Sequence, residues 1–138
     1  MNKKYSLLIS FLITLLIFLN YYSFEKVSTP NLEENILRRV IDGDTIQLET
    51  GETIRLLNIN TLEKSEKGSE LAKIFLEQYI NESIKVEITG IDKYRRQLGR
   101  IYSQEGDYLN LEIVKNGLAT KFLVEDKELK IFEEAEKQ

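Results

Sequence analysis

The chain has 138 residues, which is enough for one domain with a substantial core, and carries 19 basic and 23 acidic residues. It contains no cysteine and no histidine. Their absence excludes disulfides, thiolate metal sites, thiol nucleophiles and the Ser-His-Asp mechanism. Any catalysis must therefore use carboxylates, Arg, Lys, Tyr, or a hard cation held by oxygen ligands.

Residues 1–26 carry two basic residues near the start, Lys3 and Lys4. An almost unbroken apolar run follows from Leu7 to Leu19. A basic start followed by an apolar run is typical of a secretory signal peptide. Residues 5–24 are also about as long as a membrane-spanning helix of roughly 18 residues, and no small-residue cleavage site follows them. An uncleaved membrane anchor is therefore the alternative. Either interpretation predicts a protein that is secreted or anchored on the outer face of the cytoplasmic membrane.

Residues 27–138 hold 16 basic and 22 acidic residues, a net charge of −6. A net negative charge argues against a tight, sequence-blind binder of nucleic acid. Two local clusters of basic residues could nevertheless hold phosphates. They are Arg38 with Arg39, and Lys93, Arg95, Arg96 and Arg100.

The first half of the domain reads as strands. Residues 27–34 contain the only proline and are predicted to be a linker, so the domain proper covers 35–138. Alternating apolar residues and the turn signals "DGD" and "TGE" predict three successive antiparallel strands. They lie at 35–41, 45–49 and 53–59.

A helix is predicted next, at about 69–79, from apolar residues at helical spacing. Those residues include Leu71, Ile74, Phe75 and Tyr79. Two further strands, at 82–90 and 98–103, precede a short helix that Gly117 ends. An extended segment at 118–126 and a final helix complete the chain.

Five short strands with one helix between the third and the fourth fit a small closed barrel. The predicted fold class is α+β, mainly β: a five-stranded OB-fold Greek-key barrel with three helices, preceded by the signal or anchor segment.

Several charged residues stand in an order that is more informative than any one of them. Taken alone, "DGD" is usually a turn, Arg55 a solvated strand residue and "DKYRRQLGR" a solvated basic loop. Taken together, the blocks "VIDGDTIQL", "IRLLNINTLE", "DKYRRQLGRIY" and "IVKNGLA" resemble the staphylococcal nuclease, or thermonuclease-like, family. The resemblance extends from about Leu37 to the C-terminus. It implies an OB-fold barrel and a calcium-dependent phosphodiesterase that acts on DNA and RNA.

The resemblance also assigns catalytic residues. Arg55 and Arg96 match the two arginines that bind the scissile phosphate, and Glu63 matches the glutamate that positions or deprotonates the attacking water. The chemistry of these residues agrees with those roles. Arginine offers a permanently charged planar fork that suits phosphate, and a glutamate can act as a base where no histidine exists.

Metal and substrate residues are carried over in the same way. Asp44 and Asn60 match the two calcium-ligating aspartates, and Thr61 matches the residue that offers its backbone carbonyl. Lys93 and Tyr94 match residues that contact a terminal phosphate of the bound nucleotide. No obligate protein partner is predicted.

Three positions depart from the family pattern. Asn60 replaces an aspartate, which removes one negative charge and predicts weaker calcium binding. Leu62 stands where proline is usual. Arg95 stands where glycine is usual, so it is strained if the turn needs a positive φ. Aromatic residues that stack the nucleobase are also largely replaced in "KFLVED", where Phe122 is the partial substitute.

Two hypotheses about function follow. The first is an extracytoplasmic calcium-dependent nuclease, favoured by the joint presence of Asp44, Arg55, Glu63 and Arg96. The second is a catalytically weakened or inactive nuclease-like domain that binds an oligonucleotide or a protein partner, favoured by Asn60 and by the acidic net charge.

Overall fold

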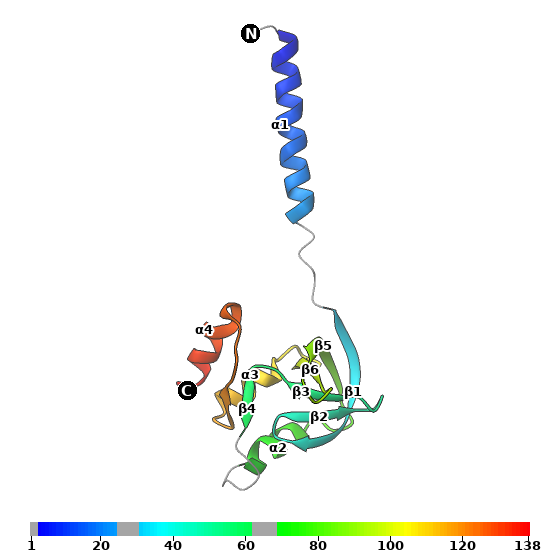
Figure 1. The fold of residues 1–138 in the computed structure, drawn as a ribbon, viewed down its shortest axis with the longest axis vertical. Coiled ribbons are helices and arrows are strands. Elements are labelled where there is room, and N and C mark those ends of the chain that lie inside the picture. Colours follow the sequence, from blue (N-terminus) through cyan, green and yellow to red (C-terminus); the bar gives the residue numbers. More distant parts are fainter. Residues whose placement is uncertain (1–2, 25–30, 62–68) are drawn as a thin grey trace. The chain divides into compact units, whose positions relative to one another are not determined.

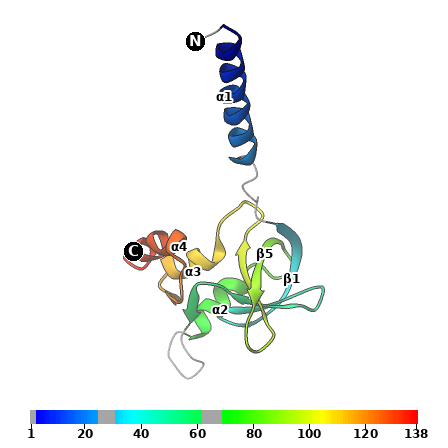
Figure 2. The same ribbon diagram turned by 45° about the horizontal axis from the view of Figure 1, so that its top comes forward.

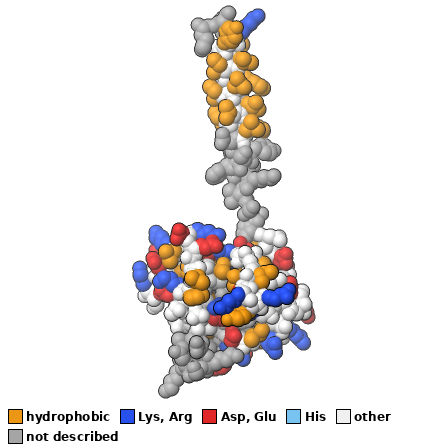
Figure 3. Space-filling view, in the orientation of Figure 1, with side chains coloured by type: hydrophobic (Ala, Val, Ile, Leu, Met, Phe, Trp, Pro, Cys, Tyr) orange, Lys and Arg blue, Asp and Glu red, His pale blue; other side chains and the backbone are white. Residues whose placement is uncertain are grey.

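The computed structural model describes residues 3–24, 31–61 and 69–138, and the chain divides into two compact units, Met1–Pro30 and Asn31–Gln138. The first unit contains helix α1 (Lys3–Phe24). Its side chains from Lys4 to Leu19 are all exposed and mostly apolar, as Figure 3 shows. Within the described residues, no helix is long and apolar enough to cross a membrane.

The second unit is built on a closed barrel of five strands (Figure 1), as predicted. Its strand order is β1-β2-β3-β6-β5, and neighbouring strands are antiparallel except β3 and β6, which are parallel. The strands are β1 (Leu32–Asp42), β2 (Thr45–Leu48), β3 (Thr53–Leu56), β5 (Ser83–Ile91) and β6 (Gln97–Tyr102).

Three helices and a small second sheet surround the barrel. Helix α2 packs against β1, whereas α3 and α4 pack on each other (Figure 2). The sheet consists of β4 paired with β7, and this pair reaches from the end of β3 to the segment after α3. The bounds are α2 (Ser69–Glu77), α3 (Leu109–Lys115), α4 (Asp126–Ala135), β4 (Ile59–Thr61) and β7 (Ala119–Lys121).

The predicted strand at 53–59 is wrong in one respect, because the chain turns in its middle. Strand β3 ends at Leu56, and Asn58 adopts a left-handed conformation with φ 67°. Asparagine tolerates this region better than most residues. The turn moves Ile59 out of the barrel sheet and into β4. At the other end of the domain, β1 begins at Leu32, inside the segment predicted to be a linker.

The apolar residues that predicted helix α2 do not all lie in the core. Leu71 and Ile74 are each 53% exposed, whereas Ala72 and Leu76 are completely buried. The backbone of Gly43 explains the small side chain, because a Cβ atom at Gly43 would lie 2.8 Å from the Cβ atom of Ala72. The helix therefore places a small side chain, that of Ala72, against the loop between β1 and β2.

The barrel core contains the alternating apolar residues that were predicted for the strands. Members that are at most 2% exposed are Leu37, Ile46, Leu48, Ile54, Leu56, Ile84, Val86 and Ile101. Helix α3 ends at the predicted place. Gly117 has φ 67°, its N–H donates to Val114, and the N–H of Leu118 donates to Ile113, which is the pattern of a Schellman cap.

A buried ion pair ties α4 to the barrel. Arg100 on β6 is 5% exposed, and its Nη2 atom lies 2.6 Å from Oε2 of Glu128 on α4. The same carboxylate accepts a hydrogen bond of 2.8 Å from Asn58, and Glu87 and Glu125 lie 3.5 and 3.8 Å from the guanidinium. Arg100 was predicted to belong to a phosphate-holding cluster, and that prediction is wrong because its charge is buried and already paired.

Replacement of Glu128 by glutamine should lower the free energy of unfolding by about 3 kcal/mol, because it leaves the buried Arg100 charge poorly compensated. Burial tends to raise the pKa of Glu128, but hydrogen bonds from Arg100 and Asn58 outweigh it and hold the pKa below the ordinary 4.5. A lowered folded-state pKa stabilises the protein above the unfolded pKa, and this contribution is lost as the pH falls through the folded value. Chemical denaturation should therefore show a difference at pH 7 that shrinks below pH 4.5. A difference that does not change with pH would contradict this assignment.

Candidate functional site

The "DGD" loop between β1 and β2 forms a turn and also places a carboxylate. The backbone N–H of Asp44 donates to Oδ1 of Asp42 at 3.2 Å, which closes the turn. Oδ2 of Asp44 then accepts from the backbone N–H and the hydroxyl of Thr61, at 3.2 and 2.9 Å. This approach requires a glycine, because a Cβ atom at Gly43 would lie 2.9 Å from Cγ2 of Thr61. The loop is therefore fixed against β4.

Arg55 on β3 is held tightly beside Asp44. The two side chains are each 13% exposed, and Nη2 of Arg55 lies 3.2 Å from Oδ2 of Asp44. The guanidinium also donates to the backbone carbonyls of Leu56 at 2.6 Å and Ile59 at 2.9 Å. Burial lowers the pKa of Arg55, and the Asp44 charge opposes this effect. Since arginine remains protonated in proteins, the result is a fixed, partly desolvated positive charge.

Asn60 contacts the same guanidinium nitrogen as Asp44. Its Oδ1 atom accepts from Nη2 of Arg55 at 3.4 Å, the longest of the contacts that this nitrogen makes. A nitrogen with two hydrogens cannot serve three acceptors equally, so the Asn60 contact is the weakest. The oxygens of Asp44 and Asn60 thus converge on one nitrogen, and Thr61 adjoins both residues.

The predicted metal ligands suit a hard cation by atom type. Asp44 offers carboxylate oxygen, Asn60 amide oxygen and Thr61 a backbone carbonyl, and calcium takes oxygen ligands. Their charge is low, since Asp44 is the single acid of this set. The described residues contain no group of three acidic side chains that could hold a metal ion. Glu63 and Leu62 lie outside the described residues.

Arg96 is positioned by the loop between β5 and β6. Asp92 accepts hydrogen bonds from the backbone N–H groups of Tyr94 and Arg96, at 2.8 and 2.9 Å. Its other oxygen lies 2.7 Å from both Nε and Nη2 of Arg96. Desolvation tends to raise the pKa of Asp92, but these bonds prevail and hold it below its ordinary value. Asp92 was not predicted as a site residue, although an acid four residues before the arginine in a short loop was the signal for it.

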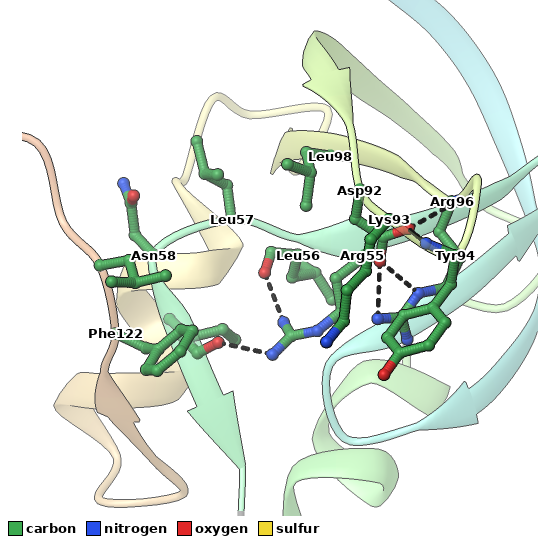
Figure 4. Close-up of a pocket in the computed structure, with 12 residues that line it drawn as sticks. Arg55, Leu56, Leu57, Asn58, Asp92, Lys93, Tyr94, Arg96, Leu98 and Phe122 are labelled. Carbon is green, nitrogen blue, oxygen red and sulfur yellow. Dashed lines mark hydrogen bonds and ion pairs between the residues drawn. The ribbon is translucent and has the colours of Figure 1, made fainter.

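Arg55 and Arg96 face one pocket of about 410 Å³ (Figure 4). The charge of Arg96 also tends to lower the pKa of Arg55, which reflects the proximity of the two guanidinium groups. Lys93 and Tyr94 form one wall, with the Lys93 ammonium 5.0 Å from the centre of the Tyr94 ring. The opposite wall is largely apolar. It contains Leu56, Leu57, Asn58, Ile59, Leu98, Phe122 and Leu123.

Of the eight predicted site residues, the structure describes seven, and it gathers them at one end of the barrel. Arg55 connects the two halves of the group. It contacts Asp44 and Asn60 on one side and shares the pocket with Arg96 on the other. Arg38 and Arg39, the other predicted basic cluster, are exposed on β1 and do not line this pocket.

Arg95, next to Arg96, has φ 66°. Its N–H donates to the carbonyl of Asp92 at 3.0 Å, which forms a tight turn at the tip of the loop. The prediction that a positive φ would strain this residue is therefore confirmed. A side chain in the left-handed region costs roughly 1–2 kcal/mol.

The fold and the pocket together define a class: small barrel domains with two arginines set beside a carboxylate, an arrangement that suits a phosphodiester. A sequence model of the family described as Staphylococcal nuclease homologue matches residues 53–138. The chain belongs to this family.

Two relatives are endonucleases by name. Endonuclease YhcR of Bacillus subtilis (strain 168) is 33% identical over 122 residues, covering 72% of this chain and 10% of that protein. An uncharacterized endonuclease of Escherichia coli O157:H7 is 31% identical over 85 residues, covering 59% of this chain and 56% of that protein. The chain thus spans a tenth and about half of the length of these two relatives.

Replacement of Arg95 by glycine should raise the free energy of unfolding by about 0.5–1 kcal/mol. Relief of a left-handed side chain is worth roughly 1–2 kcal/mol, and the added freedom of the unfolded chain offsets about 0.4–1 kcal/mol of it. Denaturant unfolding measures the change. Arg95→Ala is the matched control, because it removes the side chain and keeps the strain. An equal gain in both variants would show that the backbone is not the cause.

Proposed function

We propose that this protein is a calcium-dependent nuclease that hydrolyses phosphodiester bonds of DNA or RNA. The observation that carries the proposal is the pair of arginines, Arg55 and Arg96, which line one pocket beside the Asp44 carboxylate. Family membership and the names of the two relatives support it.

The arginine pair suits phosphoryl transfer. Negative charge gathers on the equatorial oxygens of the phosphorus during the reaction, and fixed donors stabilise it without reorganising. The guanidinium of Arg55 is held in place by two backbone carbonyls and Asp44, and that of Arg96 is held by Asp92. Both donors are therefore preorganised before a substrate arrives.

The pocket also suits a nucleotide. Its volume of about 410 Å³ lies within the range of small-ligand sites. A base can lie against the apolar wall, where Phe122 is 49% exposed and available for stacking. Lys93 and Tyr94 are exposed at the opposite wall and are the proposed contacts for a terminal phosphate.

Calcium is the proposed cofactor, with Asp44, Asn60 and the carbonyl of Thr61 as its ligands. The ion would screen the phosphate and orient the attacking water. Residues of this chain would do the rest: the two arginines orient the phosphate, and Glu63 is the proposed base that takes a proton from the water. The neutral Asn60 predicts a weak ion site.

An inactive nucleotide-binding domain is the second candidate, and Asn60 favours it. An active enzyme is favoured by two retained residues that are held in position. Asp44 accepts a hydrogen bond from Thr61, and Arg96 is paired with Asp92. Location outside the cytoplasm remains a proposal that the basic start and apolar run of residues 1–26 support.

Arg96→Gln should lower kcat/KM for single-stranded DNA by about a hundred- to a thousandfold, the typical effect of removing one preorganised donor. The measurement is cleavage by the full chain in mild detergent, with millimolar calcium or with a chelator. Arg96→Lys is the matched control, since it keeps the charge and loses the planar fork, and it should recover little activity. Absence of calcium-dependent cleavage by the unaltered protein would exclude the nuclease and favour the binding domain.

Asn60→Asp should lower the calcium concentration that gives half-maximal activity, by about tenfold, because ligand charge tunes calcium affinity. Asn60→Ala should raise that concentration, because it removes the amide oxygen. Calcium titration of cleavage, together with calorimetry of calcium binding, measures both effects. Identical calcium dependence in the three proteins would remove Asn60 from the ligand set.

A further inference from the structure

A second hollow adjoins the nucleotide pocket. It has a volume of about 350 Å³ and shares two lining residues with the first pocket, Tyr94 and Arg96. A ligand that fills the first pocket therefore has a neighbouring site immediately past these two side chains. The second hollow is lined by Glu52, Thr53, Tyr94, Arg95, Arg96 and Gln97.

Arg95 is the free cation of this hollow. Its side chain is exposed, and among the described residues it has no ion pair or side-chain hydrogen bond. Its backbone has φ 66°, a conformation that glycine adopts without strain. No contact among the described residues explains an arginine at this position. Strain of this kind at the rim of a site is an observation from which a functional role can be inferred.

We propose that Arg95 binds the phosphate of the nucleotide next to the one in the first pocket, so that the site binds a longer strand more tightly than a dinucleotide. This inference rests on the proposed nuclease function. Consecutive Cα atoms lie about 3.8 Å apart, and the side chains of Arg95 and Arg96 both line the second hollow. One strand passing over Tyr94 can therefore place successive phosphates at two neighbouring guanidinium groups.

Glu52 sets a limit on the strength of this subsite. Its carboxylate lines the same hollow and accepts hydrogen bonds from Gln97 at 3.0 Å and from Thr50 at 3.1 Å. These bonds hold a negative charge near the proposed phosphate, which weakens its binding. Arg95 and Glu52 should therefore have opposite effects on binding. Loss of the Arg95 charge should weaken the binding of a long strand, and loss of the Glu52 charge should strengthen it.

The test is binding of fluorescent oligothymidylates, two or six nucleotides long, to the full chain in mild detergent. A chelator prevents cleavage, and fluorescence anisotropy gives Kd. Arg95→Gln should weaken hexanucleotide binding by about fivefold at low salt, the upper end for an exposed charge contact, with a smaller loss for the dinucleotide. The slope of log Kd against log salt should fall by about 0.7 for the hexanucleotide, the value for one phosphate on a single strand.

Two variants separate the charge from the backbone. Arg95→Lys keeps the charge in the same strained turn and should retain most of the hexanucleotide affinity. Glu52→Gln should increase that affinity. The subsite would be overturned if Arg95→Gln weakened the binding of the dinucleotide and the hexanucleotide equally, or if it left the slope of log Kd against log salt unaltered. Either result would count even if the unaltered protein cleaves DNA. Failure of the unaltered protein to bind either oligonucleotide or to cleave would instead overturn the proposed function and the subsite together.

Discussion

The contact between Asp44 and Arg55 is the interaction on which the site depends. It joins the loop after β1 to strand β3, and through Thr61 it also reaches β4. Both side chains are largely withdrawn from water, so their attraction is less screened than that of a surface pair. The backbone carbonyls that also bind the guanidinium fix its orientation. A substrate therefore meets charges whose positions are already determined.

A second buried pair, Arg100 with Glu128, is connected to the same pocket through Asn58, which lines it. Glu128 accepts a hydrogen bond from Asn58, and the carbonyl of Asn58 accepts one from the backbone of Phe122. Asn58 is thus the point where helix α4, the turn after β3 and the segment after β7 meet. Its left-handed conformation bends the chain between Arg55 and Asn60. The bend brings the amide oxygen of Asn60 within 3.4 Å of the Arg55 guanidinium. The apolar wall of the pocket depends on this turn.

Much of this arrangement could be predicted from the sequence, because it follows from local rules. Alternating residues predicted the five barrel strands, and Gly117 predicted the end of α3. The break at Asn58 could not be predicted, because apolar residues continue on both sides of it and the turn is held by contacts to Phe122 and Glu128, which are distant in sequence. The burial of Arg100 was missed for the same reason, since its partner lies 28 positions away along the chain.

Two of the three departures from the family pattern, Asn60 and Arg95, change the local charge in the same direction. Asn60 removes a negative charge beside Arg55, and Arg95 adds a positive charge beside Arg96. Each change makes the site more attractive to phosphate and less attractive to a cation. This shift occurs in a domain whose net charge over residues 27–138 is −6, and a net negative charge disfavours the binding of nucleic acid. Under the proposed function, local attraction at the pocket of an acidic domain favours phosphate binding at the barrel end where the arginines lie, and the proposed role of Arg95 extends that region by one position along a strand.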